Sequence, residues 1–191
     1  QPDLLAVSVV ENTWFIADAM LRELNVDVPT VVGGVFPTYA PDIVINHPNV
    51  DYLCRGDGEL ALKHLCEAMA TGQDTTRIAS IWAKAEDQVY RNSIGPAIAM
   101  DDLPFPDWSI FEEQSLFRPM QGRVYKTIGI ETQRGCPYKC TFCNSPSNNY
   151  LYKDEGAGSF HRKKSVKRVR EELDHMMKEH GPEFLYFVVD T

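Results

Sequence analysis

The sequence predicts an α/β protein in which short apolar strands alternate with amphipathic helices. Strands are expected over residues 4–10, 29–32 and 50–54, because each is a short apolar run. Helices are expected between and after them, and this alternation is typical of a doubly wound parallel sheet. Glycine clusters follow the second and third strands. Ligands bind at this carboxyl edge in such sheets.

The helices of this first part are expected over residues 13–24, over residues 41–46 and from residue 59 onward. The first has apolar side chains at helical spacing at Phe15, Ile16, Ala19, Met20 and Leu24. The third has an apolar face made of Leu60, Leu62, Leu65, Cys66 and Met69. We expect both faces to pack on the sheet.

The pattern changes near residue 76. Residues 78–84 and 88–91 predict a hairpin that turns at Glu86-Asp87. Residues 101–107 contain two prolines and predict a stiff connection. The expected parts are a first domain over 1–100, a linker over 101–122 and a second domain over 123–191.

The second domain is expected to open with a strand over residues 127–132 and to continue with a helix capped by Ser165. Gly181-Pro182 ends that helix, and a strand over residues 184–189 follows. The apolar face of the helix is expected at Val166, Val169, Leu173, Met176 and Met177. Because the strand–helix pattern breaks off at both ends, we expect an internal fragment of a larger protein.

Composition narrows the function classes. The 191 residues are 43% hydrophobic and 24% charged, which is ordinary for a globular protein, and the formal charge of −8 argues against a general nucleic-acid binder. No apolar run reaches the roughly 18 residues that a membrane span needs. Three of the five cysteines fall within eight residues, a spacing that favours a reducing cytoplasm over secreted disulfides.

Those three cysteines, Cys136, Cys140 and Cys143, have the spacing C-x3-C-x2-C and can converge on one inorganic centre. A structural zinc site needs a fourth ligand, which His161 could supply. An ordinary [4Fe–4S] cluster also takes four cysteines. The spare cysteines are Cys54 and Cys66, which are both expected to be small buried hydrophobes. Three ligands therefore suggest a cluster with one iron left open.

This loop, with Phe142 before its last cysteine and residues 131–135 (ETQRG) before its first, resembles the signature of radical S-adenosylmethionine (SAM) enzymes. The resemblance implies that the three cysteines hold a [4Fe–4S] cluster at the start of a partial TIM-type (β/α) barrel. The open iron would chelate S-adenosylmethionine, and one electron would cleave it to methionine and a 5′-deoxyadenosyl radical. Phe142 would pack near the adenine, although it can equally be a core aromatic beside the loop.

Residues 2–9, 31–34 and 51–59 resemble the second half of the Rossmann-like cobalamin-binding domain that many radical SAM enzymes carry, and residues 103–107 resemble its connection to the barrel. The resemblance places Ser8, Gly33 and Gly34 along the nucleotide tail of cobalamin. A double glycine after a strand can also mark only a tight turn. The D-x-H-x-x-G segment, whose histidine ligates cobalt in other cobalamin proteins, is absent.

Other polar residues are given plainer roles. The four histidines at positions 47, 64, 175 and 180 lack a shared ligand spacing, so solvated or capping roles are expected. The basic residues Arg162, Lys163, Lys164, Lys167, Arg168 and Arg170 are expected to form a solvated helix face rather than a nucleic-acid site. Asp190 would follow the second barrel strand and point toward the cofactors.

Together the resemblances identify part of a cobalamin-dependent radical SAM enzyme, a methyltransferase or an oxidative cyclase acting on an unactivated carbon of a small molecule. They imply a reduced flavodoxin or ferredoxin as electron donor and a cytoplasmic location. They also imply that this fragment alone is inactive. The alternatives are a cobalamin-independent radical enzyme such as a methylthiotransferase, and a non-enzymatic metal-binding module. The substrate and the oligomeric state are not encoded in any motif.

Overall fold

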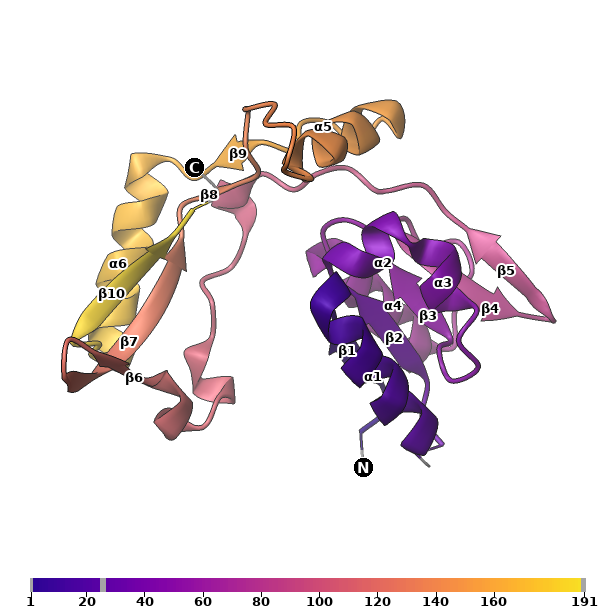
Figure 1. Cartoon of the computed structure of the whole chain (residues 1–191), viewed down its shortest axis with the longest axis horizontal. Coiled ribbons are helices and arrows are strands. Elements are labelled where there is room, and N and C mark those ends of the chain that lie inside the picture. Colours follow the sequence, from indigo (N-terminus) through magenta and orange to yellow (C-terminus); the bar gives the residue numbers. More distant parts are fainter. Residues whose placement is uncertain (1, 25–26, 190–191) are drawn as a thin grey trace. The chain divides into compact units, whose positions relative to one another are not determined.

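The chain forms two compact units in a computed structural model that describes residues 2–24 and 27–189 (Figure 1). The first unit is the chain up to Pro96 together with Glu155–Ala157. The second is Ala97–Asp154 and the chain from Gly158 onward. Within the described residues, no helix combines the length and the apolar character that crossing a membrane requires.

The first unit is built on a five-stranded sheet. Its strands are β1 (Leu5–Ser8), β2 (Thr30–Gly33), β3 (Tyr52–Cys54), β4 (Ile81–Ala85) and β5 (Gln88–Arg91). They lie in that order, with β1, β2 and β3 parallel and the β4–β5 hairpin joined antiparallel to β3. Glu86 and Asp87 turn the hairpin with φ values of 51° and 61°, as a two-residue type I′ turn requires. The predicted α/β fold is confirmed.

Helices cover both faces of this sheet. They are α1 (Glu11–Glu23), α2 (Val35–Tyr39), α3 (Pro41–Ile45) and α4 (Glu59–Thr71). One face packs α1 and α3 against Val32, Leu53 and Trp82. The other packs α4 against Val31, Ile81 and Ala83. The helices between the strands thus bury apolar surface on one sheet, and the parallel pairing of β1, β2 and β3 places their carboxyl ends at a common edge.

The predicted apolar face of α1 was wrong, and that of α4 was right only at Leu65 and Met69. Large side chains expected against the sheet are exposed, among them Phe15, Ile16, Met20, Leu24, Leu60 and Leu62. The buried positions are Ala17 and Leu21 on α1 and Ala61, Leu65 and Ala68 on α4. Small alanines let a helix approach the sheet closely, so the contacting faces combine alanines with Leu21 and Leu65.

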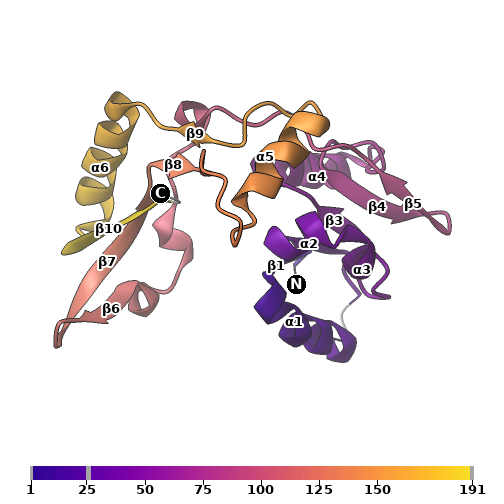
Figure 2. The same ribbon diagram turned by 45° about the horizontal axis from the view of Figure 1, so that its top comes forward.

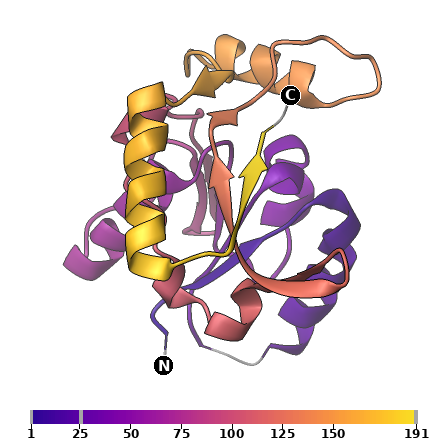
Figure 3. The same ribbon diagram turned by 90° about the vertical axis from the view of Figure 1, so that its left-hand side faces the viewer.

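The second unit is built on a three-stranded sheet with the order β10-β7-β6. Its strands are β6 (Phe117–Met120), β7 (Arg123–Glu131) and β10 (Phe184–Val188). β10 runs parallel to β7 and β6 runs antiparallel to it. Helix α6 (Val166–His180) lies along β7 and β10 (Figure 3), and Met176 packs there on Ile128 and Ile130. The expected strand–helix–strand unit is therefore present.

Two predictions for α6 need correction. Val166 and Met177 were expected on its buried face, and both are exposed. Glu172, which lies one turn before Met176, is fully buried instead. A carboxylate occupies this inner position because a lysine reaches it from outside the helix, as described below.

Several elements were not predicted. They are α2, the 3₁₀ turns Met100–Asp102, Trp108–Ile110 and Glu113–Leu116, strand β6, helix α5 (Ser145–Asp154), and the short strands β8 (Gln133–Arg134) and β9 (Arg162–Lys163). The expected linker over residues 101–122 thus contains three turns and a strand paired with β7. The functional assignment of the three parts of the chain stays a prediction.

Candidate metal and cofactor site

The three clustered cysteines lie on one loop that runs from β8 to α5 (Figure 2). Cys136 is half-buried, whereas Cys140 and Cys143 are exposed, and all three thiols are free. The loop is held to the helix that follows it, because Asn149 Nδ2 donates to the carbonyl of Cys136 at 2.9 Å. The amide of Ser145, the first residue of α5, donates to Cys143 Sγ at 3.4 Å. A helix N-terminus favours negative charge, so this end of the loop suits a thiolate.

The entry to the loop is fixed by Gly135 and by an ion pair. Gly135 has φ +79°, and a Cβ there would lie 2.8 Å from both the ring and the carbonyl oxygen of Phe160. Arg134 donates through Nε and Nη2 to the two carboxylate oxygens of Glu131 at 3.0 and 2.9 Å. A bidentate pair of this kind fixes direction as well as distance. The chain therefore leaves β7 along a defined path toward Cys136.

The donor set fits a [4Fe–4S] cluster with three protein ligands, since three free thiols lie on one short loop. The side chains have not converged: within residues 2–24 and 27–189, no three Cys, His, Asp or Glu side chains are grouped to hold a metal ion. His161, the alternative fourth ligand, is half-buried beyond α5. The assignment of Cys136, Cys140 and Cys143 as ligands stays a prediction.

Phe142 is the most exposed large hydrophobic residue in the described part of the chain, with 92% of its surface accessible. This exposure excludes the alternative that Phe142 is a core aromatic within this chain. A ring held at the tip of the loop is free to stack on a planar ligand, so its predicted place beside an adenine stays open. Asp190 lies outside the described residues.

The remaining two cysteines differ from each other. Cys54 is buried at the end of β3, and burial raises the pKa of its thiol to about 12, so it stays protonated. Cys66 was also expected to be buried, and that prediction was wrong: it lies on the exposed side of α4. The error arises because α4 packs on the sheet through Ala61, Leu65 and Ala68 and not through the face that carries Cys66. Both cysteines belong to the first unit, whereas the three clustered thiols belong to the second.

The predicted cobalamin residues meet at the carboxyl edge of β1 and β2. A Cβ on Gly34, whose φ is +105°, would lie 2.5 Å from the carbonyl oxygen of Val9 and 3.1 Å from Ser8 Oγ. A Cβ on Gly33 would lie 3.5 Å from Cys54 Cβ, which is an ordinary contact. Gly34 is therefore required by the close approach of two backbones. Ser8 is exposed, and the role of these three residues toward a cofactor stays a prediction.

Sequence reasoning missed an anchored segment of the first unit, Glu155–Ala157. Glu155 accepts a hydrogen bond from the amide of Ile94 at 2.6 Å and pairs with Arg55 Nη1 at 2.9 Å. The Arg55 guanidinium also lies 5.3 Å from the centre of the Trp82 ring. Arg55 directly follows β3. A single arginine after a strand does not indicate that its partner is Glu155, which lies far along the chain.

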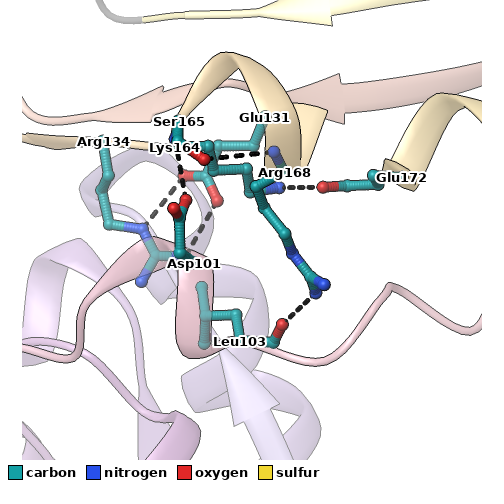
Figure 4. Close-up of polar contacts among 8 residues, drawn as sticks. All are labelled: Asp101, Leu103, Glu131, Arg134, Lys164, Ser165, Arg168 and Glu172. Atoms are coloured by element: carbon teal, nitrogen blue, oxygen red, sulfur yellow. Dashed lines mark hydrogen bonds and ion pairs between the residues drawn. The ribbon is translucent and has the colours of Figure 1, made fainter. Parts of the chain in front are cut away.

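Two of the plainer expectations hold only in part. His47 is buried rather than solvated, but its Nδ1 accepts a hydrogen bond from the amide of Asn49 at 3.1 Å, in the capping role that was also expected. Burial lowers the pKa of the His47 imidazole although Asp18 lies 3.5 Å from Nε2. The basic residues near the start of α6 are not a uniformly solvated face. Arg162 donates to the carbonyl of Ile98 at 2.9 Å, and Lys164 pairs with Glu172 at 2.6 Å (Figure 4). Both basic side chains are thus occupied by internal partners.

Curated proteins similar to this chain include radical enzymes. An uncharacterized methyltransferase of Pyrococcus horikoshii is 28% identical over 200 residues, covering 100% of this chain and 40% of its own length. The anaerobic magnesium-protoporphyrin IX monomethyl ester cyclase of Rubrivivax gelatinosus is 28% identical, covering 96% of this chain and 33% of its own length. The cobalamin-dependent radical SAM methyltransferase TokK of Streptomyces tokunonensis is 26% identical over 75% of the chain. No protein-family model matches.

Solved structures share the fold. The radical SAM methyltransferase TsrM from Kitasatospora setae superposes with a TM-score of 0.64 at 19% identity, over 98% of this chain and 37% of its own. The cobalamin-dependent SAM radical enzyme OxsB superposes with a TM-score of 0.71 at 23% identity, over 100% of this chain and 26% of its own. The predicted resemblance is confirmed: the relatives include methyltransferases, one of them a cobalamin-dependent radical SAM enzyme, and an anaerobic cyclase, and this chain spans at most 40% of the length of each of these three.

Proposed function

We propose that this chain is part of a cobalamin-dependent radical SAM enzyme and carries its cluster loop. The observation that carries the proposal is the loop of three free thiols between β8 and α5, on a chain whose relatives include such enzymes. In this role Cys136, Cys140 and Cys143 hold the cluster, and the Glu131–Arg134 pair sets the direction in which the loop leaves β7.

When bound, a [4Fe–4S] cluster and cobalamin supply one-electron cleavage of S-adenosylmethionine and transfer of a methyl group. Phe142 presents an exposed ring beside the thiols, suited to stack on adenine. Ser8, Gly33 and Gly34 offer a side-chain-poor edge at β1 and β2 that a bulky ligand can approach.

The substrate class is a small molecule, and methyl transfer or oxidative ring closure is the reaction type. Both outcomes are represented among the relatives, by the methyltransferases and by the anaerobic cyclase. The electron donor is a reduced flavodoxin or ferredoxin, and the location is the cytoplasm, where free thiols persist. Nucleic acid is not a partner, in keeping with the net charge of −8.

Anaerobic reconstitution with iron and sulfide tests the ligand assignment. We expect about four iron and four sulfide per chain, and a loss of most of this iron in Cys136→Ala. Cys66→Ala is the matched control, because Cys66 is an exposed cysteine of the first unit. Retention of zinc in place of iron, or equal loss in the two variants, would overturn the proposal.

A further inference from the structure

A buried ion pair lies where β9 meets α6. Lys164 Nζ donates to Glu172 Oε2 at 2.6 Å, and the two side chains are only 5% and 1% exposed. The other carboxylate oxygen, Glu172 Oε1, is buried without a hydrogen-bond partner. Removing two charges from water costs several kcal/mol, and the attraction within the pair often only repays that cost. Stability alone is therefore a weak reason for this pair.

The pair is linked to the cysteine loop through the backbone. The amide of Lys164 donates to the carbonyl of Thr132 at 2.9 Å. This bond extends the antiparallel β8–β9 ladder, in which Gln133 pairs with Lys163 and Arg134 pairs with Arg162. Only Gly135 then separates the ladder from Cys136. The position of β9 therefore sets where the loop begins.

The helix that holds Glu172 is itself fixed by contacts away from the loop. Ser165 caps α6, and its own amide donates to Asp101 at 2.8 Å. Arg168 donates to the carbonyl of Leu103, and its guanidinium lies 4.0 Å from the centre of the Phe105 ring. Figure 4 shows the contacts of Ser165 with Asp101 and of Arg168 with Leu103 at the start of α6. Glu172 is thus presented from a support that does not depend on β8 or the loop.

We propose that Lys164 and Glu172 are positioning residues for the cysteine loop. The pair fastens β9 to α6, and the two-residue β8–β9 ladder passes that position on to Cys136. A ladder of two residues is too short to fix the register of β8 against β9 by itself. A directional ion pair excludes shifted registers that an apolar contact would allow. The importance of this position for a cluster rests on the proposed function, whereas the effect on the loop does not.

The alkylation rate of each cysteine in the metal-free chain tests the inference directly. In Lys164→Met and in the nearly isosteric Glu172→Gln, we expect Cys136 to react about threefold faster or more, because the ladder opens more often. Cys66 serves as an internal reference of constant rate. Lys167→Met is the matched control, because Lys167 is 85% exposed and pairs only loosely, at 3.8 Å, with Glu171.

The double variant Lys164→Met/Glu172→Met separates positioning from stability. Removing both charges is expected to restore the thermal stability lost in the single variants while leaving Cys136 as reactive as in them. Unchanged Cys136 reactivity in both single variants, or full protection of Cys136 in the double variant, would overturn the inference. So would an equal effect of Lys167→Met.

Iron content after reconstitution distinguishes this inference from the proposed function. If the unaltered chain binds a cluster, both single variants are expected to bind less than half as much iron. If the unaltered chain binds none, the proposed function fails while the alkylation rates still decide the inference. If the unaltered chain and both single variants take up the same full amount of iron, the role of the Lys164–Glu172 pair is contradicted while the proposed function stands.

Discussion

The two units position their candidate residues by different physical means. In the first, Ser8, Gly33 and Gly34 are held by backbone packing at the edge of a sheet that is covered on both faces. In the second, two ion pairs, Glu131–Arg134 and Lys164–Glu172, hold the path to the cysteine loop in addition to the close approach of Gly135 to Phe160. Backbone packing tolerates little change, whereas an ion pair can be altered one charge at a time. The two regions should therefore respond differently to substitution.

The second sheet also differs in how much of it is covered. Helix α6 packs on one face, and the other face lines a hollow of about 720 Å³ that includes Thr127, Gly129, Phe184 and Tyr186. Tyr186 is largely exposed there. The sheet of the first unit is thus covered on both faces, whereas only one face of the second sheet packs against a helix of the described residues.

The largest expected effect of substitution is in that core. Leu65 on α4 is fully buried against the sheet, so Leu65→Ala should lower the free energy of unfolding of the first unit by about 2–5 kcal/mol. Hydrogen exchange of the strand amides measures the loss of stability separately in each unit. We expect faster exchange in β2 and β3 and unchanged exchange in β7. An equal acceleration in β7 would show that the division into two units is wrong.

A smaller effect is expected at Gly34. An alanine there meets the carbonyl of Val9 in a left-handed conformation, so Gly34→Ala should destabilise the first unit by about 1–3 kcal/mol. Gly72→Ala is the control, because Gly72 also has a positive φ, +67°, but nothing lies within 4 Å of its Cβ position. Urea unfolding, monitored by circular dichroism, compares the free energies of unfolding of the two variants. Equal losses would mean that the close approach to Val9 is unimportant.

Features that depend on local sequence could be predicted, whereas features that depend on distant partners could not. The parallel strands and the hairpin were predicted because β-branched runs and turn residues are local signals. The faces of α1 and α4 were not, since packing through Ala17, Ala61 and Ala68 is decided by the sheet. The cysteine spacing located the candidate loop. The anchor of the first unit, Glu155, and the pair beside the loop, Lys164 and Glu172, depend on partners distant in sequence or on burial, which no local pattern encodes.

The smallest of these effects is a pH dependence of the first unit. Burial lowers the pKa of His47 below its usual 6.5, so folding favours the neutral imidazole. The unfolded chain then binds more protons, and stability should be complete above pH 6.5 and fall as pH drops below that value. Urea unfolding at pH 7.5 and 5.5 measures the difference. His47→Gln should reduce it and the exposed His64→Gln should not; the reverse pattern would contradict the assignment.

In the proposed function, the cysteine loop holds a cluster with one iron open to S-adenosylmethionine. We would test this by electron paramagnetic resonance of the reduced, iron-reconstituted chain, with and without S-adenosylmethionine. We expect a [4Fe–4S] signal whose g-values change when S-adenosylmethionine is added. A signal indifferent to S-adenosylmethionine, or a chain that takes up zinc and forms no cluster, would contradict it.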